Sequence, residues 1–255
     1  MRTTNHISSL TPLRGIAAIL IVIYHFNLLL GVLLPENIML VDKWYLMVDL
    51  FFVLSGFIIY HVYGSWFTGQ VRQKQFLIYL KARFARLYPL HFFTLLVMIG
   101  MSSLLWFHLG YDKLGPFEQA ITDPKAILTS LLLIQAWGFH ETAPLNTASW
   151  SISVEFFLYL LFPWMIMFLA HYGRPARWIL GSLAALMLLS ITFYFSVYTD
   201  PHAKAYTIGV ITGTALLRGL AGFIAGMLVY ELYRVRWQQG ILKQGHWFLG
   251  IWFLL

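Results

Sequence analysis

The sequence contains no cysteine and few charged residues. Without cysteine the chain has no disulfide, no thiolate nucleophile and no Cys-ligated metal. Only 11% of its 255 residues are charged, whereas a soluble domain carries about a quarter. Hydrophobic residues make up 60% of the chain, and the mean hydropathy is +0.73. The composition excludes a soluble globular domain and is typical of an integral membrane protein with several spans.

Several motifs with a known mechanism are also missing. The chain has no nucleotide-binding glycine loop, no HExxH zinc pair and no G-x-S-x-G nucleophile elbow. It has no internal repeat and no second soluble domain, so we expect residues 1–255 to form one transmembrane domain. The net charge of +7 does not indicate nucleic acid, because the basic residues cluster in short segments between apolar runs. There they set topology or meet anionic lipids and ligands, and neither a nucleic-acid partner nor a bound metal is expected.

Long apolar runs predict an all-α bundle of transmembrane helices. A hydrocarbon core of about 30 Å requires roughly 20 apolar residues per helix. Six runs meet this requirement: 13–34, 44–63, 87–109, 150–170, 178–198 and 207–233. The run 126–139 is shorter, and is a short span, a re-entrant element or an interfacial helix. Another run begins at His246 and is cut off at Leu255, so we expect six to eight spans in a chain truncated from a longer one.

The charges between the runs predict an orientation. The stretch 64–86 holds five basic residues and no acid, which indicates the cytoplasm. The loops 35–43 and 110–125 are mixed or acidic and suit the outside, which leaves the basic N-terminus cytoplasmic. If 126–139 does not cross, the later basic loops also fall inside. Charge alone therefore favours a non-crossing element there.

The first run contains a pair of ionisable residues, Arg14 and His25. They are eleven residues apart, which is three helical turns plus about 20°. Both therefore lie on one face of a helix, separated by roughly 16 Å along its axis. An ionisable group as deep as His25 costs about 2.5 kcal/mol or more if charged, and so indicates a functional site. The alternative is a neutral histidine bonded to another helix, with Arg14 at the membrane interface.

Polar and small residues also interrupt the second run. Asp49 begins the segment DLFFVLSGFIIY, and Ser55 and Gly56 follow about two turns later. Asp49 either caps the outer end of a helix or is a buried group with a function. Ser55 and Gly56 are expected to permit the close approach of another helix, because small residues are the usual contact points between membrane helices.

A pair of arginines precedes the third run, in KARFARLYPLHF. Arg83 and Arg86 are three residues apart and share a helix face, where two guanidinium groups suit a phosphate or pyrophosphate. The alternative is simple positive-inside anchoring. Pro89 is expected in the first turn of a new helix or at a kink near its entrance.

A carboxylate lies inside the fourth run, in the segment NTASWSISVEFFLYLLFP. The small polar residues predict a helix that begins near Trp150, with Glu155 about a turn and a half inside it. A carboxylate at this depth needs a partner, and Arg14, His25 and the arginine pair are the candidates.

Three blocks taken together resemble the membrane-bound acyltransferase 3 family, whose members move acyl groups onto sugars of bacterial lipopolysaccharide, exopolysaccharide and related glycans. They are LRGIAAILIVIYHF, DLFFVLSGFII followed by RFARLYP, and SWSISVEFFLYLLFP. The resemblance covers about residues 8–233. Family members usually have about ten spans, which implies that C-terminal spans are missing here. That span number fits best if 126–139 crosses, against the charge argument, and both alternatives stay open.

The resemblance implies a multi-pass enzyme of the bacterial inner membrane. Its donor would be an acyl-coenzyme A, usually acetyl, bound from the cytosol, and its acceptor a hydroxyl of a glycan or lipid-linked sugar. By position, His25 matches the family's catalytic histidine, Arg14 its paired arginine, and Arg83 and Arg86 its RxxR motif. A neutral imidazole suits the general base, Glu155 is a candidate to orient it, and the arginine pair suits the phosphates of coenzyme A.

Two other functions fit the same residues. In a transporter, His25, Asp49 and Glu155 would line a proton or substrate pathway, since buried ionisable groups serve that role equally well. The missing inverted repeat and the basic residues gathered at one cytosolic segment count against this hypothesis. A catalytically inactive membrane scaffold is the third possibility.

Overall fold

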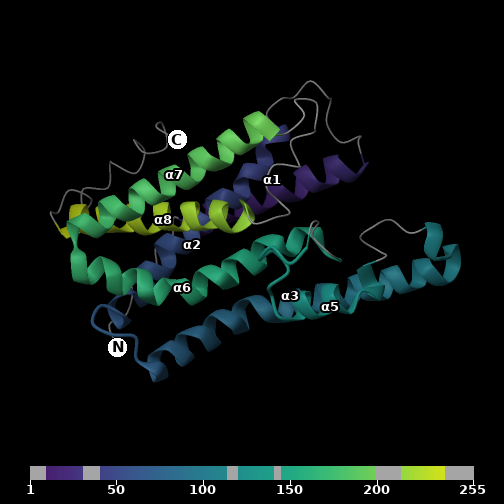
Figure 1. Cartoon of the computed structure of the whole chain (residues 1–255), viewed down its shortest axis with the longest axis horizontal. Helices are drawn as coiled ribbons and strands as arrows, with labels where there is room; N and C mark the ends of the chain where they lie inside the picture. The colour runs from purple at the N-terminus through teal and green to yellow at the C-terminus, as the bar shows by residue number, and fades with distance from the viewer. Residues whose placement is uncertain (1–9, 31–40, 114–119, 141–144, 199–213, 239–255) are drawn as a thin grey trace.

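The computed structural model describes residues 10–30, 41–113, 120–140, 145–198 and 214–238, and within these ranges the chain is helical with no strand. These described ranges contain seven α-helices (Figure 1): α1 (Leu10–Leu30), α2 (Met47–Tyr63), α3 (Gln73–Leu109), α5 (Pro124–Leu131), α6 (Trp150–Tyr172), α7 (Arg174–Tyr198) and α8 (Thr214–Gln238). The 3-10 turns η1 (Val41–Leu46) and η5 (Thr147–Ser149) lead into α2 and α6. The predicted all-α bundle is confirmed.

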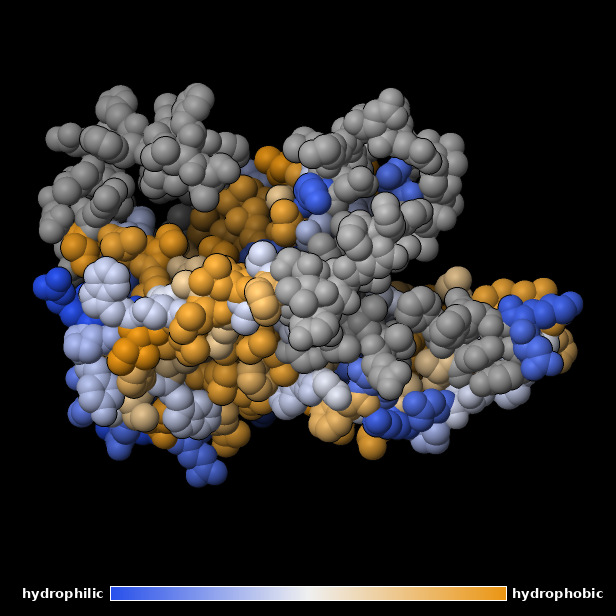
Figure 2. Space-filling model, turned by 45° about the horizontal axis from the view of Figure 1, so that its top comes forward, coloured by the Kyte–Doolittle hydropathy of each residue, from blue (hydrophilic) through white to orange (hydrophobic). Residues whose placement is uncertain are grey.

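In the part of the chain that the structure describes, six stretches are long and apolar enough to cross a membrane: Leu10–Asn27, Lys43–Trp66, Gln73–Leu109, Thr147–Tyr172, Arg174–Phe193 and Thr214–Val235. Each contains one of the six predicted runs or most of it. Apolar side chains dominate the middle of the visible surface, and most hydrophilic ones lie toward its edges (Figure 2). This distribution suits a molecule whose middle faces lipid. The run that begins at His246 lies outside the described residues.

Helices α2 and α8 run side by side in the same direction and form the closest helix contact of the bundle. A Cβ added at Gly56 of α2 would lie 2.1 Å from the carbonyl oxygen of Phe223 in α8. A Cβ added at Gly226 of α8 would lie 1.9 Å from the carbonyl oxygen of Val53 in α2. Glycine is therefore required on both sides, and the expectation that Gly56 permits close helix approach is confirmed.

The remaining helices pack around this pair in alternating directions. Helix α7 runs antiparallel to α8, with Gly181 beside Leu228. Helix α6 runs in the same direction as α2 and packs against α8, where Val154 contacts Gly219. Helix α3 runs antiparallel to α6, because Phe76 packs against Trp164 at 5.5 Å and Phe84, farther along α3, packs against the earlier Phe156 at 6.3 Å.

This arrangement brings many basic residues to one end of the bundle, which is at the left in Figure 1. Here α2, α6 and α8 end, and α3 and α7 begin. We call it the basic end, and its members are Arg72, Lys74, Arg174, Arg177 and Arg234. The opposite end holds η1 and the first residues of α8.

The short run 126–139 forms a re-entrant element. Helix α5 has eight residues, and at 1.5 Å per residue it spans roughly 12 Å, far less than a bilayer core. Its Ser130 carbonyl oxygen accepts a hydrogen bond of 2.8 Å from His91 Nε2, halfway along α3. The chain then turns back through Leu133, whose φ is +59°, and whose carbonyl oxygen accepts from Ser153 Oγ at 2.8 Å. The element therefore enters and returns on the same side, as the loop charges favoured.

Helix α3 differs from the sequence-based expectation. The third apolar run begins at residue 87, but α3 begins at Gln73 and continues for 37 residues. Of the two places expected for Pro89, the first turn of a new helix is wrong, because Pro89 lies in the interior of α3. Membrane helices tolerate proline, because the freed backbone groups can be satisfied locally. The basic segment is therefore the first part of this helix.

The α2–α8 contact gives a test of the fold. We expect Gly226→Ala to lower the free energy of unfolding by about 1–3 kcal/mol, because its methyl group would overlap the Val53 carbonyl and push the helices apart. Gly100→Ala is the matched control, since this glycine lies inside α3 with nothing within 4 Å of the added Cβ. Thermal unfolding of the detergent-solubilised variants measures both. Equal stability of the two variants would contradict the close contact.

Candidate active site

A cavity of about 490 Å³ lies between α1, α2, α3 and the start of α6. Four of the five predicted site residues line it: Arg14, His25, Arg86 and Glu155. The polar lining also includes Ser55 and Ser151, and most of the remaining wall is apolar. The structure thus brings together ionisable groups from three helices that are up to 141 residues apart in the sequence.

The imidazole ring of His25 is held by a hydrogen bond within its own helix. Its Nδ1 lies 2.9 Å from the carbonyl oxygen of Ile21, one turn earlier in α1. A carbonyl oxygen only accepts hydrogen bonds, so Nδ1 carries the proton and the neutral ring keeps its lone pair at Nε2. This is the tautomer that a general base requires.

Glu155 is held by two hydroxyl groups. Ser55 Oγ donates to its Oε1 at 2.8 Å, and the Tyr159 hydroxyl donates to the same oxygen at 2.5 Å. Its hydrogen bonds in the described chain are thus to Ser55 and Tyr159, whereas the Ile21 carbonyl orients His25. These hydrogen bonds therefore do not support the hypothesis that Glu155 orients the imidazole of His25.

The two arginines of the RxxR segment occupy different surroundings. Arg86 lines the cavity. Arg83 turns toward the aromatic residues beside it: its Nη2 donates to the Tyr63 hydroxyl at 3.1 Å, and its guanidinium lies 5.0 Å from the Tyr63 ring centre and 6.0 Å from that of Tyr159. Its Nε is buried and has no hydrogen-bond partner. Only Arg86 is placed to meet a ligand in the cavity directly.

The charged groups are ordered along the axis of the bundle. At the end opposite the basic end, Tyr24 packs against Tyr45 of η1 with ring centres 6.2 Å apart, and His25 follows it. Arg14 lies about 16 Å farther along α1, toward the basic end, where it interacts electrostatically with Arg86 and Glu155. The cavity therefore has a cationic region toward the basic end and an imidazole toward the opposite one.

Asp49 has a partner that the sequence reasoning missed. The guanidinium of Arg218 in α8 donates from Nε and Nη2 to the two carboxylate oxygens of Asp49, each at 2.6 Å. Arg218 is only 6% exposed and also lies over the rings of Tyr45 and Trp150, at 5.4 and 5.6 Å. Asp49 is thus neither a helix cap nor a lining residue of the cavity. The sequence did contain a signal for this partner, because Arg218 is an arginine inside the apolar run 207–233.

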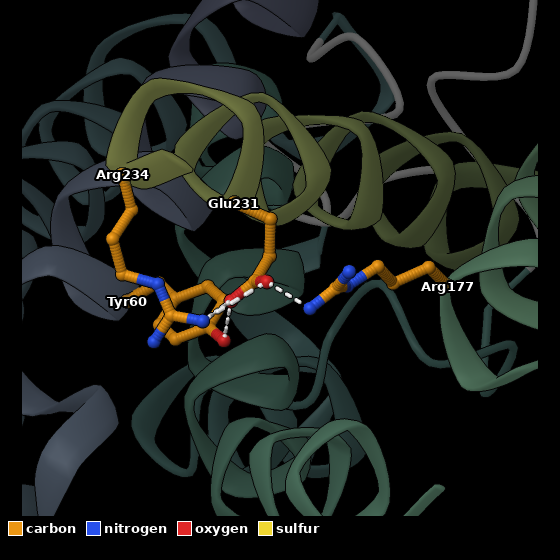
Figure 3. A network of polar contacts seen from close by, with 4 residues as sticks. All are labelled: Tyr60, Arg177, Glu231 and Arg234. Atoms are coloured by element: carbon orange, nitrogen blue, oxygen red, sulfur yellow. Dashed lines mark hydrogen bonds and ion pairs between the residues drawn. The ribbon is translucent and has the colours of Figure 1, made fainter. Parts of the chain in front are cut away.

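A second ion cluster forms at the basic end (Figure 3), around the carboxylate of Glu231 in α8. Glu231 is 4% exposed and accepts hydrogen bonds from the Tyr60 hydroxyl of α2 and from Arg234. Arg177 of α7 makes an ion pair with it at 2.8 Å. Glu231 therefore joins three helices outside the cavity, and the sequence reasoning did not single it out.

No group of three or more His, Cys, Asp or Glu residues that could hold a metal occurs among the described positions. The cavity instead combines guanidinium groups, an imidazole and a carboxylate. Such groups can bind a phosphate and move a proton.

The fold and the cavity together define a polytopic helical membrane protein with a polar site enclosed between its spans. The sequence profile described as the acyltransferase domain, Acyl_transf_3, matches residues 7–255. The chain belongs to this family.

Several curated proteins are similar to parts of the chain. Acyltransferase MdmB of Streptomyces mycarofaciens is 32% identical over 145 residues, which cover 55% of this chain and 33% of MdmB. Protein 2 in the picA locus of Rhizobium radiobacter is 35% identical over 59% of this chain and 74% of its own length. O-acetyltransferase OatA of Staphylococcus aureus is 27% identical over 81% of this chain and 32% of OatA. The chain thus spans about a third of MdmB and OatA, and no solved structure matches it.

The Asp49–Arg218 pair gives a second test. We expect Arg218→Ala to lower the free energy of unfolding by about 3–5 kcal/mol, because it leaves the Asp49 carboxylate without its partner. The double variant Asp49→Leu with Arg218→Leu should recover most of this loss, since an apolar pair removes both charges. Arg174→Ala, an exposed arginine at the first residue of α7, is the control. Thermal unfolding in detergent measures all three, and an Arg218→Ala protein as stable as the control would contradict the assignment.

Proposed function

We propose that the protein is an O-acyltransferase that moves an acyl group, usually acetyl, from acyl-coenzyme A to a hydroxyl of a cell-surface or secreted glycan. The observation that carries the proposal is the cavity that His25, whose Nδ1 is bonded to the Ile21 carbonyl oxygen, lines together with Arg14, Arg86 and Glu155. The name of the relative OatA, an O-acetyltransferase, supports an oxygen acceptor and an acetyl group.

His25 acts as the general base toward the acceptor. A sugar hydroxyl is a weak nucleophile until its proton is removed as it attacks the thioester carbonyl, and a neutral imidazole is well matched to this task near pH 7. Its hydrogen bond to the Ile21 carbonyl fixes the ring so that Nε2 receives that proton. The same carbonyl stabilises the imidazolium that forms, because it accepts from Nδ1 in both protonation states.

The arginines bind the donor. Coenzyme A carries several phosphate charges, for which a guanidinium in a partly enclosed cavity is a strong partner. Arg86 makes this contact directly, together with Arg14. Arg83 holds Tyr63 and Tyr159 in place behind it and so supports Glu155 through Tyr159. Desolvation of the arginines in the membrane strengthens their attraction for phosphate.

The orientation follows from the basic end. We propose that this end faces the cytosol of a bacterium and the protein lies in its inner membrane, since cytoplasmic segments carry the excess of Lys and Arg. Helix α1 then begins on the cytosolic side. The donor enters toward Arg14 and Arg86, and the acceptor approaches His25 from the opposite side.

The transporter hypothesis is weaker on this geometry. It needs His25, Asp49 and Glu155 on one pathway, but Asp49 is bound by Arg218 and does not line the cavity with the other two. An Asp–Arg pair with two hydrogen bonds of 2.6 Å is a poor proton carrier, because protonation would break the pair.

The proposed function is tested by transfer from radiolabelled acetyl-coenzyme A in membranes that carry the protein and its glycan acceptor. We expect His25→Ala to lower transfer by about a hundredfold or more, in line with the loss of a general base. His25→Gln should be equally impaired, because an amide cannot take the proton at neutral pH. Membrane insertion of both variants is checked in parallel. Substantial transfer by a well-inserted His25→Ala protein would contradict the role of the base.

The roles of Arg86 and Arg83 are distinguished by measuring how transfer depends on donor concentration. We expect Arg86→Lys to raise the KM for acetyl-coenzyme A by about ten- to a hundredfold, because lysine keeps the charge but loses the forked hydrogen bonds, worth about 1.5–3 kcal/mol each. Arg83→Lys should lower kcat more than it raises KM, because Arg83 contacts Tyr63 and Tyr159.

Arg174→Lys is the matched control for charge at the basic end and should leave both constants unchanged. An unchanged KM in Arg86→Lys would remove the phosphate contact from the proposal. It would also leave the acyl-coenzyme A donor without its main support.

A further inference from the structure

The hydroxyl group of Ser55 has no part in the base mechanism, yet it lies in the same cavity. Ser55 is 5% exposed and lines the cavity with Arg86 and His25. Its Oγ donates its proton to Glu155 Oε1 at 2.8 Å. A serine hydroxyl bonded to a carboxylate has the arrangement of an activated nucleophile and its base.

The position of Ser55 is fixed by its neighbours in sequence and space. Gly56, the next residue of α2, is pressed against the Phe223 carbonyl of α8, so α2 cannot slide or rotate at this level. The Tyr159 hydroxyl holds the same carboxylate oxygen that Ser55 contacts. Ser55 Oγ thus gives its one proton to Glu155 and keeps its lone pairs available for bonding to carbon.

Ser55 also shares one cavity with both functional regions. Arg14 and Arg86 form the cationic region toward the basic end, and His25 lies about 16 Å from Arg14 along α1. A donor held by its phosphates at the arginines and an acceptor held at His25 therefore approach from different directions. A nucleophile in the same cavity can receive the acyl chain from the donor and pass it to the acceptor.

We propose that Ser55 is the acyl carrier of this enzyme and that transfer proceeds in two steps through a serine ester. The proposal rests on the proposed function, from which it takes the donor and the role of His25. In the first step Ser55 Oγ attacks the thioester carbonyl carbon, the O–C bond forms and the C–S bond breaks. The serine proton passes to Glu155 and then to the departing thiolate, which leaves as coenzyme A thiol.

The second step returns the serine. The acceptor hydroxyl oxygen attacks the ester carbonyl carbon and gives its proton to His25 Nε2. The bond between the carbonyl carbon and Ser55 Oγ breaks, and Oγ takes the proton from the imidazolium. Each step uses one base that the structure places in the cavity, Glu155 for the serine and His25 for the sugar. No other reactant is required.

An isotope exchange measures the first step alone. Membranes carrying the protein are incubated with acetyl-coenzyme A and radiolabelled coenzyme A without glycan acceptor, and the label that enters acetyl-coenzyme A is followed. The wild-type protein and His25→Ala should both exchange, because the first step does not use the imidazole. Ser55→Ala should lose both exchange and transfer to glycan by a hundredfold or more.

Two variants separate a nucleophile from a group that only positions Glu155. Tyr159→Phe removes the other hydrogen bond to Glu155 and should reduce exchange by about tenfold or less, whereas a positioning role predicts equal losses for Tyr159→Phe and Ser55→Ala. Ser55→Cys keeps a nucleophile and should accumulate an acetyl group that hydroxylamine removes, seen in the mass of the intact protein. The acetylation of Ser55→Cys also distinguishes a nucleophile from a positioning group if the Ser55→Ala protein does not insert into the membrane.

The outcomes distinguish the two proposals. Transfer by Ser55→Ala within tenfold of wild type overturns the role of Ser55 as acyl carrier and leaves the proposed function standing. Transfer by the wild-type protein without isotope exchange has the same consequence. No acetylation of Ser55→Cys also overturns the carrier. Failure of the wild-type protein to transfer acetyl from coenzyme A to any glycan overturns both proposals.

Discussion

The close contact of α2 with α8 is the constraint on which the rest of the molecule depends. Two helices meet so tightly that Gly56 and Gly226 each face a backbone carbonyl of the other helix. Lipid chains are as apolar as the side chains of the helices, so burial of apolar surface gives little drive for association. Backbone proximity and polar pairs must supply it, and both are concentrated at this contact.

An ion pair at one end and a hydrogen bond at the other fix the register of that contact. Asp49 and Arg218 join the two helices near their beginnings, and Tyr60 and Glu231 join them near the basic end. Between the pairs, α2 presents Ser55 to α6, where Glu155 accepts its proton. A slip of one residue would unpair buried charges, which costs about 3–5 kcal/mol each. The serine and the carboxylate in the cavity are thus positioned by contacts that lie outside it.

The cavity contains ionisable side chains of a kind that rarely occur inside a membrane. Arg14, His25, Arg86 and Glu155 all line it, with His25 bonded to the Ile21 carbonyl oxygen and Glu155 to the hydroxyl groups of Ser55 and Tyr159. Arg83 stands behind them on the rings of Tyr63 and Tyr159. The same low dielectric that makes these groups costly makes them effective toward phosphate and thioester groups.

The sequence by itself determined the spans and the shared face of Arg14 and His25, because these depend only on local hydropathy and the helical repeat. For residues 126–139 it left crossing and non-crossing open, since the loop charges and the family's number of spans disagreed. It also placed Gly56 at a helix contact. Only the tertiary structure decided which charges pair. Arg218 and Glu231 bind residues of α2 that are 169 and 171 positions away. The Ile21 carbonyl rather than Glu155 orients His25. Arg83 contacts Tyr63, whereas Arg86 lines the cavity. A partner across a helix contact is fixed by the register and rotation of both helices, and the sequence of neither helix contains that information.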